Sequence, residues 1–165
     1  MLLWNIKQKQ MKKFYTLIIL FSFLISCKSN QSIKDELIFI VQMEVMDNKS
    51  DVEIEEFSKY YTNAINLNEP NSLGWGFFNA FGGIQNKNDR IILIERYSNQ
   101  EAMMEHAKNI SEGGVLENDF NMFKEHFNIQ KIDVYGNTTN EFRQFLKPFG
   151  LTFYFHPTLS KFSRN

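Results

Sequence analysis

The stretch IILIERYSNQEAMMEHA, residues 91–107, decides how this chain is expected to fold. Its first part, 91–97, is an apolar run that ends in Glu-Arg-Tyr, and such branched apolar runs are typical of β-strands. Its second part predicts a helix, because Ser98 and Glu101 have the spacing of a capping box. The strand passes directly into this helix, whose apolar face carries Ala102, Met103, His106 and Ala107.

Upstream of this stretch, the chain has a strand, a helix and a further strand. Alternating apolar and polar residues predict a strand over 37–46, and a capping box before apolar residues at helical spacing predicts a helix over 50–65. A loop over 66–72 leads to a strand over 73–81. The large side chains of that strand fall on one face, and they are Leu73, Trp75, Phe77 and Phe81.

The remaining segments complete the list of expected elements. Residues 82–89 predict a hairpin connection between two strands. A helical stripe covers 116–127, and a strand follows over 129–135. A last helix is expected over 138–146, capped by Thr and Glu, and a short strand over 151–156.

The order of these elements predicts an α+β fold. Over 37–136 the order is β-α-β-β-α-β with one additional helix, which is the ferredoxin-like split βαβ arrangement with an antiparallel sheet. Residues 137–165 form a C-terminal helical appendage. The domain organisation is therefore a folded domain over 37–136 followed by this appendage.

The predicted sheet is apolar on both faces, although a split βαβ unit covers only one face with helices. An uncovered apolar face usually marks an interface. We therefore expect two copies to pair as a homodimer whose sheets close into a dimeric α/β barrel. The alternative is that residues 137–165 cover this face within one chain.

Three segments, taken in order, resemble the antibiotic biosynthesis monooxygenase (ABM) superfamily: EPNSLGW at 69–75, IILIERY at 91–97 and SNQEAMMEH at 98–106. Asn71 departs from the pattern, since many members have glycine there. The resemblance covers 37–136 and implies a dimeric α+β barrel. It also implies, for some members, a cofactor-less monooxygenase that oxidises quinols or polycyclic phenols with molecular oxygen.

The resemblance identifies His106 as a candidate general base, because it matches the superfamily's histidine and the ordinary pKa of histidine is about 6.5. Trp75 could stack on an aromatic ligand and donate its indole N–H. Arg96 could stabilise an oxyanion. Asn71 and Tyr97 are the candidate substrate-binding residues, which would orient a phenol. This set of residues requires no cofactor.

Each catalytic candidate also has a structural interpretation. His106 could be a satisfied histidine between helix and sheet, and Trp75 could be a core side chain. Arg96 could be a surface charge that pairs across the strands, for example with Glu44. Two functions therefore stay open. One is a cofactor-independent monooxygenase of small quinols or phenols, and the other is a non-catalytic barrel that binds a small ligand or has a structural role.

A metal site is not predicted. The three histidines, His106, His126 and His156, are far apart in sequence, and none occurs in a His-x-x-x-His or Glu-x-x-His pair. Some relatives degrade haem, but no second histidine matches the haem ligand of that branch. We expect His126 to face solvent on its amphipathic helix.

The N-terminal segment resembles the signal peptide of a bacterial lipoprotein. An apolar run over 16–25 follows two lysines, is too short to span a bilayer, and leads to a lipobox-like Ser-Cys. We expect residues 1–26 to be removed, with translation starting at Met1 or at Met11, and Cys27 to be lipidated. Residues 27–36 then form the acylated cysteine and a flexible tether. The domain is expected in the cell envelope, outside the cytoplasm and anchored to a membrane.

Charge narrows the partners that we expect. Removal of the signal peptide leaves 14 basic and 19 acidic side chains, a formal charge of −5. Nucleic acid is not an expected partner, because its recognition needs a basic footprint. The expected partners are a second copy, a membrane through the lipid at Cys27, and a small apolar or aromatic ligand.

Overall fold

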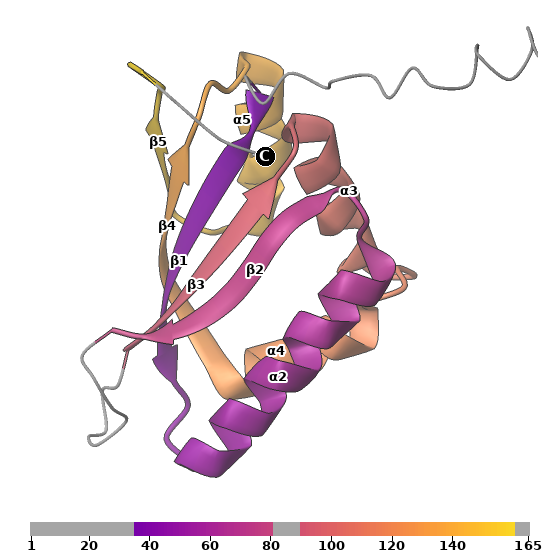
Figure 1. Ribbon diagram of the computed structural model, residues 1–165, viewed down its shortest axis with the longest axis vertical. Helices are drawn as coiled ribbons and strands as arrows, with labels where there is room; N and C mark the ends of the chain where they lie inside the picture. The colour runs from indigo at the N-terminus through magenta and orange to yellow at the C-terminus, as the bar shows by residue number, and fades with distance from the viewer. Residues whose placement is uncertain (1–34, 81–89, 161–165) are drawn as a thin grey trace, which may run out of the picture. The chain divides into compact units, whose positions relative to one another are not determined.

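The computed structural model describes residues 35–80 and 90–160 (Figure 1), which form an α+β domain. Its five strands form one sheet in the order β2-β3-β1-β4-β5. Neighbouring strands are antiparallel, except that β5 runs parallel to β4. The elements in chain order are β1 (Leu37–Val45), α2 (Asp51–Asn68), β2 (Ser72–Asn79), β3 (Arg90–Tyr97), α3 (Gln100–Asn109), α4 (Glu117–His126), β4 (Phe127–Tyr135), α5 (Asn140–Leu146), η2 (Lys147–Phe149) and β5 (Phe153–His156). The order of β1 to β4 confirms the split βαβ unit.

Several predicted features lie outside the described residues. They are the signal peptide, Cys27, the start of the tether, Phe81 and the hairpin connection over 82–89. Within the described ranges, no helix combines the length and the apolar character that a membrane span requires.

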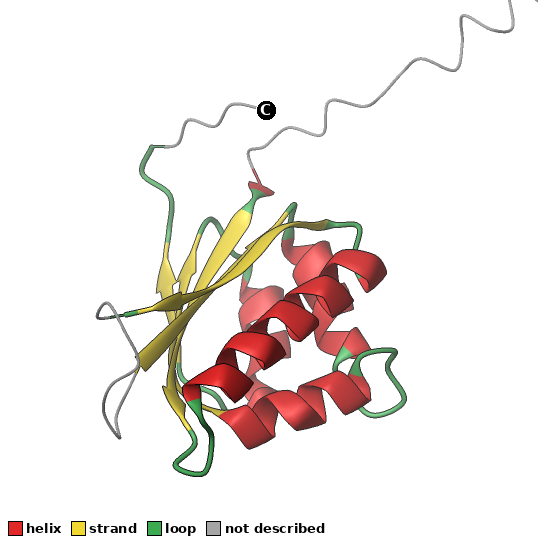
Figure 2. Ribbon diagram, turned by 60° about the horizontal axis from the view of Figure 1, so that its bottom comes forward, coloured by secondary structure: helices red, strands yellow, loops and turns green. Residues whose placement is uncertain are grey.

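The helices gather on one side of the sheet (Figure 2). The side chains of β1 that point to this side are buried, whereas the alternate ones are only partly buried, as expected for a strand covered on one face. Helix α2 contributes its apolar stripe to the same core through Ile54, Phe57, Tyr61 and Ile65. Its start is the predicted capping box, in which Ser50 and Glu53 satisfy each other's backbone N–H groups.

Two other helices begin one residue later than predicted. Asn99, not Ser98, accepts the first-turn backbone N–H of α3. Thr139, not Thr138, does the same for α5. In both cases the sequence offers two good capping residues side by side, so spacing alone could not choose between them.

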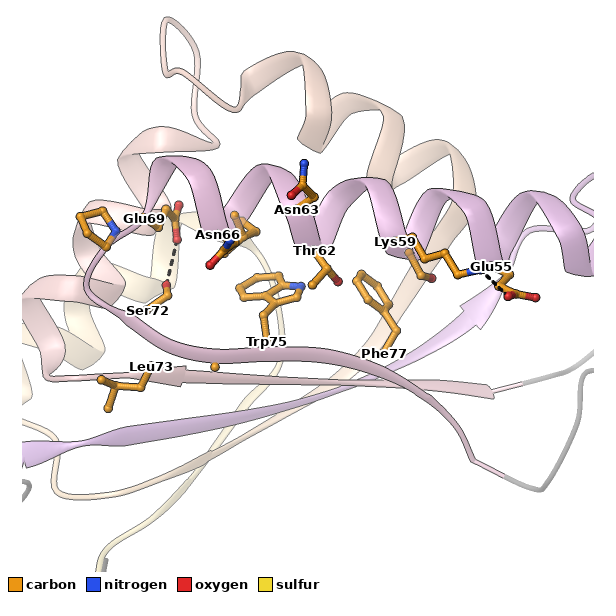
Figure 3. Close-up of a pocket in the computed structure, with 14 residues that line it drawn as sticks. Glu55, Lys59, Thr62, Asn63, Asn66, Glu69, Ser72, Leu73, Trp75 and Phe77 are labelled. Atoms are coloured by element: carbon orange, nitrogen blue, oxygen red, sulfur yellow. Dashed lines mark hydrogen bonds and ion pairs between the residues drawn. The ribbon is translucent and has the colours of Figure 1, made fainter. Parts of the chain in front are cut away.

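The start of β2 corrects the predicted face of Leu73. The pairing with β3 shifts between Ser72 and Gly74, which leaves Leu73 as the extra residue of a bulge, 48% exposed. Trp75 and Phe77 keep the predicted direction and point toward α2, while Leu73 points away from it (Figure 3).

The described part of the C-terminal appendage extends the helix-covered side of the domain. Helix α5 buries Phe142 and Leu146 in the core, and β5 adds an edge strand to the sheet beside β4. Neither element lies over the opposite face of the sheet (Figure 2).

The face of the sheet turned away from the helices is apolar at its centre. Its residues alternate with the buried ones along β1 and β3, and in β2 the exposed Phe78 lies beside them. We call these residues the open face, and they are Ile38, Ile40, Ile92, Ile94 and Phe78. Within the described residues, no helix covers them.

Candidate functional site

A histidine–glutamate pair is buried where α2 ends against α3. Nδ1 of His106, on α3, lies 2.9 Å from Oε1 and 3.0 Å from Oε2 of Glu69, the C-cap of α2. Their side chains are only 6% and 4% exposed. A buried carboxylate is stable only when it is paired and hydrogen-bonded. The geometry therefore favours a charged pair in which His106 donates its Nδ1 proton to Glu69.

Two further donors hold Glu69. The Ser72 hydroxyl donates to Oε2 at 3.1 Å, and Asn109 donates to Oε1 at 3.2 Å. Burial alone would raise the pKa of Glu69, but these donors and His106 hold that pKa below its ordinary value. Burial alone would lower the pKa of His106, and the bond to Glu69 with the nearby charge of Glu95 raises it instead. Both shifts stabilise the charged forms.

A second buried acid lies on β3. Glu95 is 7% exposed, and its Oε2 accepts a hydrogen bond from the Tyr97 hydroxyl at 2.9 Å. Burial raises the pKa of Glu95 to about 7, although the charge of His106 and the bond from Tyr97 act in the opposite direction. Glu95 therefore exchanges its proton near neutral pH, unlike an exposed glutamate.

Trp75 lies against this polar cluster with an unused hydrogen-bond donor. Its ring centroid is 5.3 Å from that of His106 and 5.9 Å from that of Tyr61. Among the described residues, its indole Nε1 is the one buried side-chain nitrogen or oxygen that has no hydrogen-bond partner. An orphaned buried donor is costly and often marks a place where a ligand or water supplies the acceptor.

These polar groups reach a small, partly open cavity of about 70 Å³. Glu95, His106, Trp75 and Tyr61 contribute to its wall, and the rest is apolar, with side chains from every layer of the core. The lining residues include Phe39, Leu93, Met103, Phe123, Ile132 and Leu146. The cavity is smaller than the roughly 300–1,000 Å³ of ordinary ligand pockets.

A larger groove lies between α2 and β2 (Figure 3), with a volume of about 710 Å³. Polar side chains of α2, including Thr62, Asn63 and Asn66, form one wall, and β2 forms the other. Trp75 lines both this groove and the small cavity. Among the described residues, Trp75 is the one that the two linings share.

The structure brings together three of the five predicted catalytic and substrate-binding residues. Trp75, Tyr97 and His106 lie in one cluster, and the ring centroids of Tyr97 and His106 are 5.7 Å apart. Arg96 points to the opposite face of the sheet, where its Nε and Nη2 lie 2.7 Å from Oε1 of Glu36. Asn71 is exposed and donates to Glu105 at 3.1 Å. Of the five predicted residues, Trp75 and His106 line the cavity, whereas Tyr97, Arg96 and Asn71 do not.

Sequence reasoning did not assign a role to either acid of the cluster. Glu69 is the first residue of the EPNSLGW segment, and Glu95 interrupts the apolar run of IILIERY. Both belong to the segments that carry the resemblance, but neither was given a role in the site. The available signal for Glu95 was its spacing. It falls on the same face of β3 as Ile91 and Leu93, where an acid must be buried.

The two remaining histidines lie elsewhere. His126 does not simply face solvent as predicted, because its ring stacks on Phe57 at 4.0 Å and its Nδ1 donates to the carbonyl of Met122. His156 on β5 pairs with Asp133 at 2.8 Å. In the described part of the chain, no group of three or more His, Cys, Asp or Glu residues is arranged to hold a metal ion.

Comparisons with known proteins support the fold. No family model and no curated protein sequence matches the chain. Among solved structures, MupZ from Pseudomonas fluorescens is similar with a TM-score of 0.53 and 20% identity, over 79% of this chain and 95% of that one.

Two further structures are similar at lower scores. SnoaB, a cofactor-independent oxygenase from Streptomyces nogalater, has a TM-score of 0.47 and 11% identity over 64% of this chain and 96% of its own. A candidate antibiotic biosynthesis monooxygenase from Bacteriodes thetaiotaomicron has a TM-score of 0.42 and 14% identity over 62% and 88%. At these identities a likeness concerns the fold, and the activity has to be argued from the site.

Proposed function

We propose that this protein is a membrane-anchored, cofactor-independent monooxygenase that oxidises a small phenol or quinol with molecular oxygen. The observation that carries the proposal is the buried charged pair of His106 and Glu69, in which His106 lines an apolar cavity together with Trp75 and Glu95. These groups are arranged to receive an aromatic hydroxyl and to hold its anion.

Oxygen chemistry without a cofactor requires such an arrangement. The protein has to remove a proton from the substrate, stabilise the electron-rich anion and exclude water. The His106 imidazolium can stabilise an oxyanion in this cavity. The apolar remainder of the wall suits an aromatic ring.

The groove between α2 and β2 is the proposed route to the cavity. A phenol ring needs more room than the present cavity of about 70 Å³ provides, whereas the groove of about 710 Å³ accepts it readily. Trp75 lines both spaces, so a rotation of its side chain is the proposed way in which they join. Substrate entry then couples to movement of the same ring that stacks on the substrate.

The open face is the proposed surface for a second copy of the chain. Its apolar centre, with Ile40 and Ile94 side by side on β1 and β3, is bordered by the Arg96–Glu36 and His156–Asp133 ion pairs. An apolar patch within a polar rim is typical of two-fold interfaces. Light scattering should report a dimer for the native chain and a folded monomer for Ile94→Glu. A native monomer would refute this part of the proposal.

The lipid anchor at Cys27 is proposed from the sequence alone. Substitution Cys27→Ser should abolish acylation and release the protein from the membrane fraction. Normal processing and membrane fractionation of this variant would show that Cys27 is not the anchor. Anchoring to a membrane would bring the site close to hydrophobic quinols.

Oxygen uptake tests the proposed activity. The full-length protein, purified in detergent, should consume oxygen with members of a panel of hydroquinones and phenols. His106→Gln should reduce the rate by about 100-fold or more if His106 acts on the transition state. His126→Gln is the matched control, because His126 is a half-buried histidine outside the cavity and the groove. No uptake from the folded protein would contradict the proposal.

A non-catalytic ligand-binding or structural barrel is the second candidate function. The small volume of the cavity favours it, and so does the saturated hydrogen bonding of Glu69. This function predicts that aromatic ligands bind without oxygen consumption, and that His106→Gln affects stability rather than turnover. Binding titrations run beside the uptake assay therefore separate the two candidates.

A further inference from the structure

Glu95 occupies a position where the fold itself calls for an apolar side chain. It lies on the helix-covered face of β3, paired with Phe39 on β1 and with Trp75 on β2. Its neighbours along the same face of the strand are Leu93 and Tyr97. Burying a carboxyl group there costs free energy that an apolar residue would not cost.

The surroundings of Glu95 leave its charge poorly compensated. Its hydrogen-bond donor is the Tyr97 hydroxyl at 2.9 Å, and its remaining surface lies in the cavity wall. Glu69 presents the contrast, because three side chains donate to its two oxygens. Of the two acids in this cluster, Glu69 is held as an anion, and Glu95 is the one that can take up a proton.

His106, which the sequence suggested as a base, is poorly suited to that role. Its Nδ1 is committed to Glu69, and the pairing favours the imidazolium form. A cation has no lone pair with which to accept a proton. It can instead stabilise an anion that forms beside it.

We propose that Glu95 is the proton acceptor of this site, while the His106–Glu69 pair stabilises the substrate anion. The inference rests on the proposed function and assigns its acid–base step. In that step the O–H bond of a phenol or quinol breaks and its proton passes to a carboxylate oxygen of Glu95. The electron pair stays on the substrate oxygen, next to His106. The total charge of the site is unchanged, and no other reactant takes part.

The titrating groups around Glu95 set the pH range of this step. His106 faces it from α3, Glu69 from the end of α2, Tyr61 from α2, and Tyr97 lies on its own strand. Burial raises the pKa of both tyrosines, so they stay neutral. With the pKa of Glu95 at about 7, the accepting carboxylate is present at and above neutral pH. Tyr97 is a positioning residue that orients this carboxylate.

A binding experiment without oxygen tests the inference apart from turnover. The full-length protein is mixed anaerobically with 4-nitrophenolate in weakly buffered indicator solution at about pH 8, where Glu95 is ionised. Entry of an anion beside Glu95 should drive its protonation, so the wild type should take up about one proton per bound ligand. Glu95→Gln should take up none. Proton uptake that persists in Glu95→Gln, or is absent from the wild type, would overturn the inference.

Two variants serve as controls for this experiment. Glu105→Gln removes an exposed acid of α3 that does not line the cavity, and it should behave as wild type. Tyr97→Phe removes the donor that lowers the pKa of Glu95, so proton uptake should persist to higher pH than in the wild type. An unchanged pH range in Tyr97→Phe would count against Glu95, even if Glu95→Gln failed to fold.

Turnover then distinguishes failure of this inference from failure of the proposed function. Glu95→Gln should lose oxygen uptake by about 100-fold or more with weakly acidic hydroquinones. The loss should be much smaller with nitrated hydroquinones that are already ionised, because no proton then has to be removed. An equal loss with both substrates would refute the role of Glu95. Proton uptake without any oxygen consumption by the wild type would support Glu95 and refute the oxygenase.

Discussion

Replacing Glu95 by glutamine should stabilise the protein, although Glu95 lies in the candidate site. The pKa of Glu95 is about 7 in the fold, against 4.5 for an unperturbed glutamate. A difference of one pKa unit corresponds to about 1.4 kcal/mol, so ionised Glu95 destabilises the folded state by about 3 kcal/mol. Glutamine keeps an oxygen that can accept from Tyr97 and carries no charge.

The sign of the pH dependence follows from the direction of the shift. The folded state binds the proton of Glu95 more tightly than the unfolded state does, because burial raises this pKa. Wild-type stability therefore falls as pH rises from the unfolded value of 4.5 to about 7, and this contribution is constant above that range. The stability of Glu95→Gln should not show this decrease with pH, because glutamine does not titrate.

Urea unfolding, followed by the fluorescence of Trp75 beside the site, measures the effect. The free energy of unfolding of Glu95→Gln minus that of wild type should grow by about 3 kcal/mol between about pH 4.5 and pH 8. If the amide of the introduced glutamine lacks a hydrogen-bond partner, it lowers the free energy of unfolding by the same amount at every pH. It therefore does not affect the change of the difference with pH. Glu105→Gln, an exposed acid on α3, should show no such growth. A flat difference for Glu95→Gln would refute a raised pKa and with it the proton-accepting role.

Three further predictions concern the rest of the domain. Glu69→Gln should cost about 3 kcal/mol, because it leaves His106 buried without its carboxylate. Since the pKa of Glu69 is lowered and that of His106 is raised in the fold, this loss should be full between about pH 4.5 and pH 6.5 and should shrink on either side, as pH falls through the folded pKa of Glu69 or rises through that of His106; urea unfolding at several pH values would reveal this. Trp75→Phe should change the unfolding free energy by less than about 1 kcal/mol, because the lost packing is offset by removal of an orphaned N–H, yet calorimetry should show weaker phenol binding. Phe142→Ala should cost about 3–5 kcal/mol in thermal or urea unfolding, whereas Phe149→Ala, at a position 38% exposed, should cost far less; equal costs would contradict the packing of α5.

The sequence predicted the strands and helices because their local signals agree with the tertiary structure. Apolar alternation in β1 and the capping box of α2 each point to the element that forms. The bulge at Leu73 was missed because it depends on how β2 pairs with β3, which the sequence of β2 alone does not contain. The capping residues of α3 and α5 were each displaced by one position for the local reason given above.

The candidate site was less predictable than the fold. His106, Trp75 and Tyr97 were found through a pattern of residues, and the structure places them together. Arg96 was grouped with them although it is adjacent to Glu95, and adjacent residues of a strand point to opposite faces. The partner of Arg96, Glu36, is 60 residues away in the chain, so no local pattern revealed the ion pair.

Along β1 and β3, side chains alternate between the helix-covered face and the open face of the sheet, so each strand has two sets of residues with different roles. Odd-numbered positions, such as Phe39 and Glu95, specify the core and the cavity, whereas even-numbered positions, such as Ile40 and Ile94, specify the open face. A substitution in one set leaves the other nearly untouched, because the sheet backbone separates them. The proposed ligand chemistry and the proposed self-association therefore depend on different residues, so each can be engineered without redesigning the other.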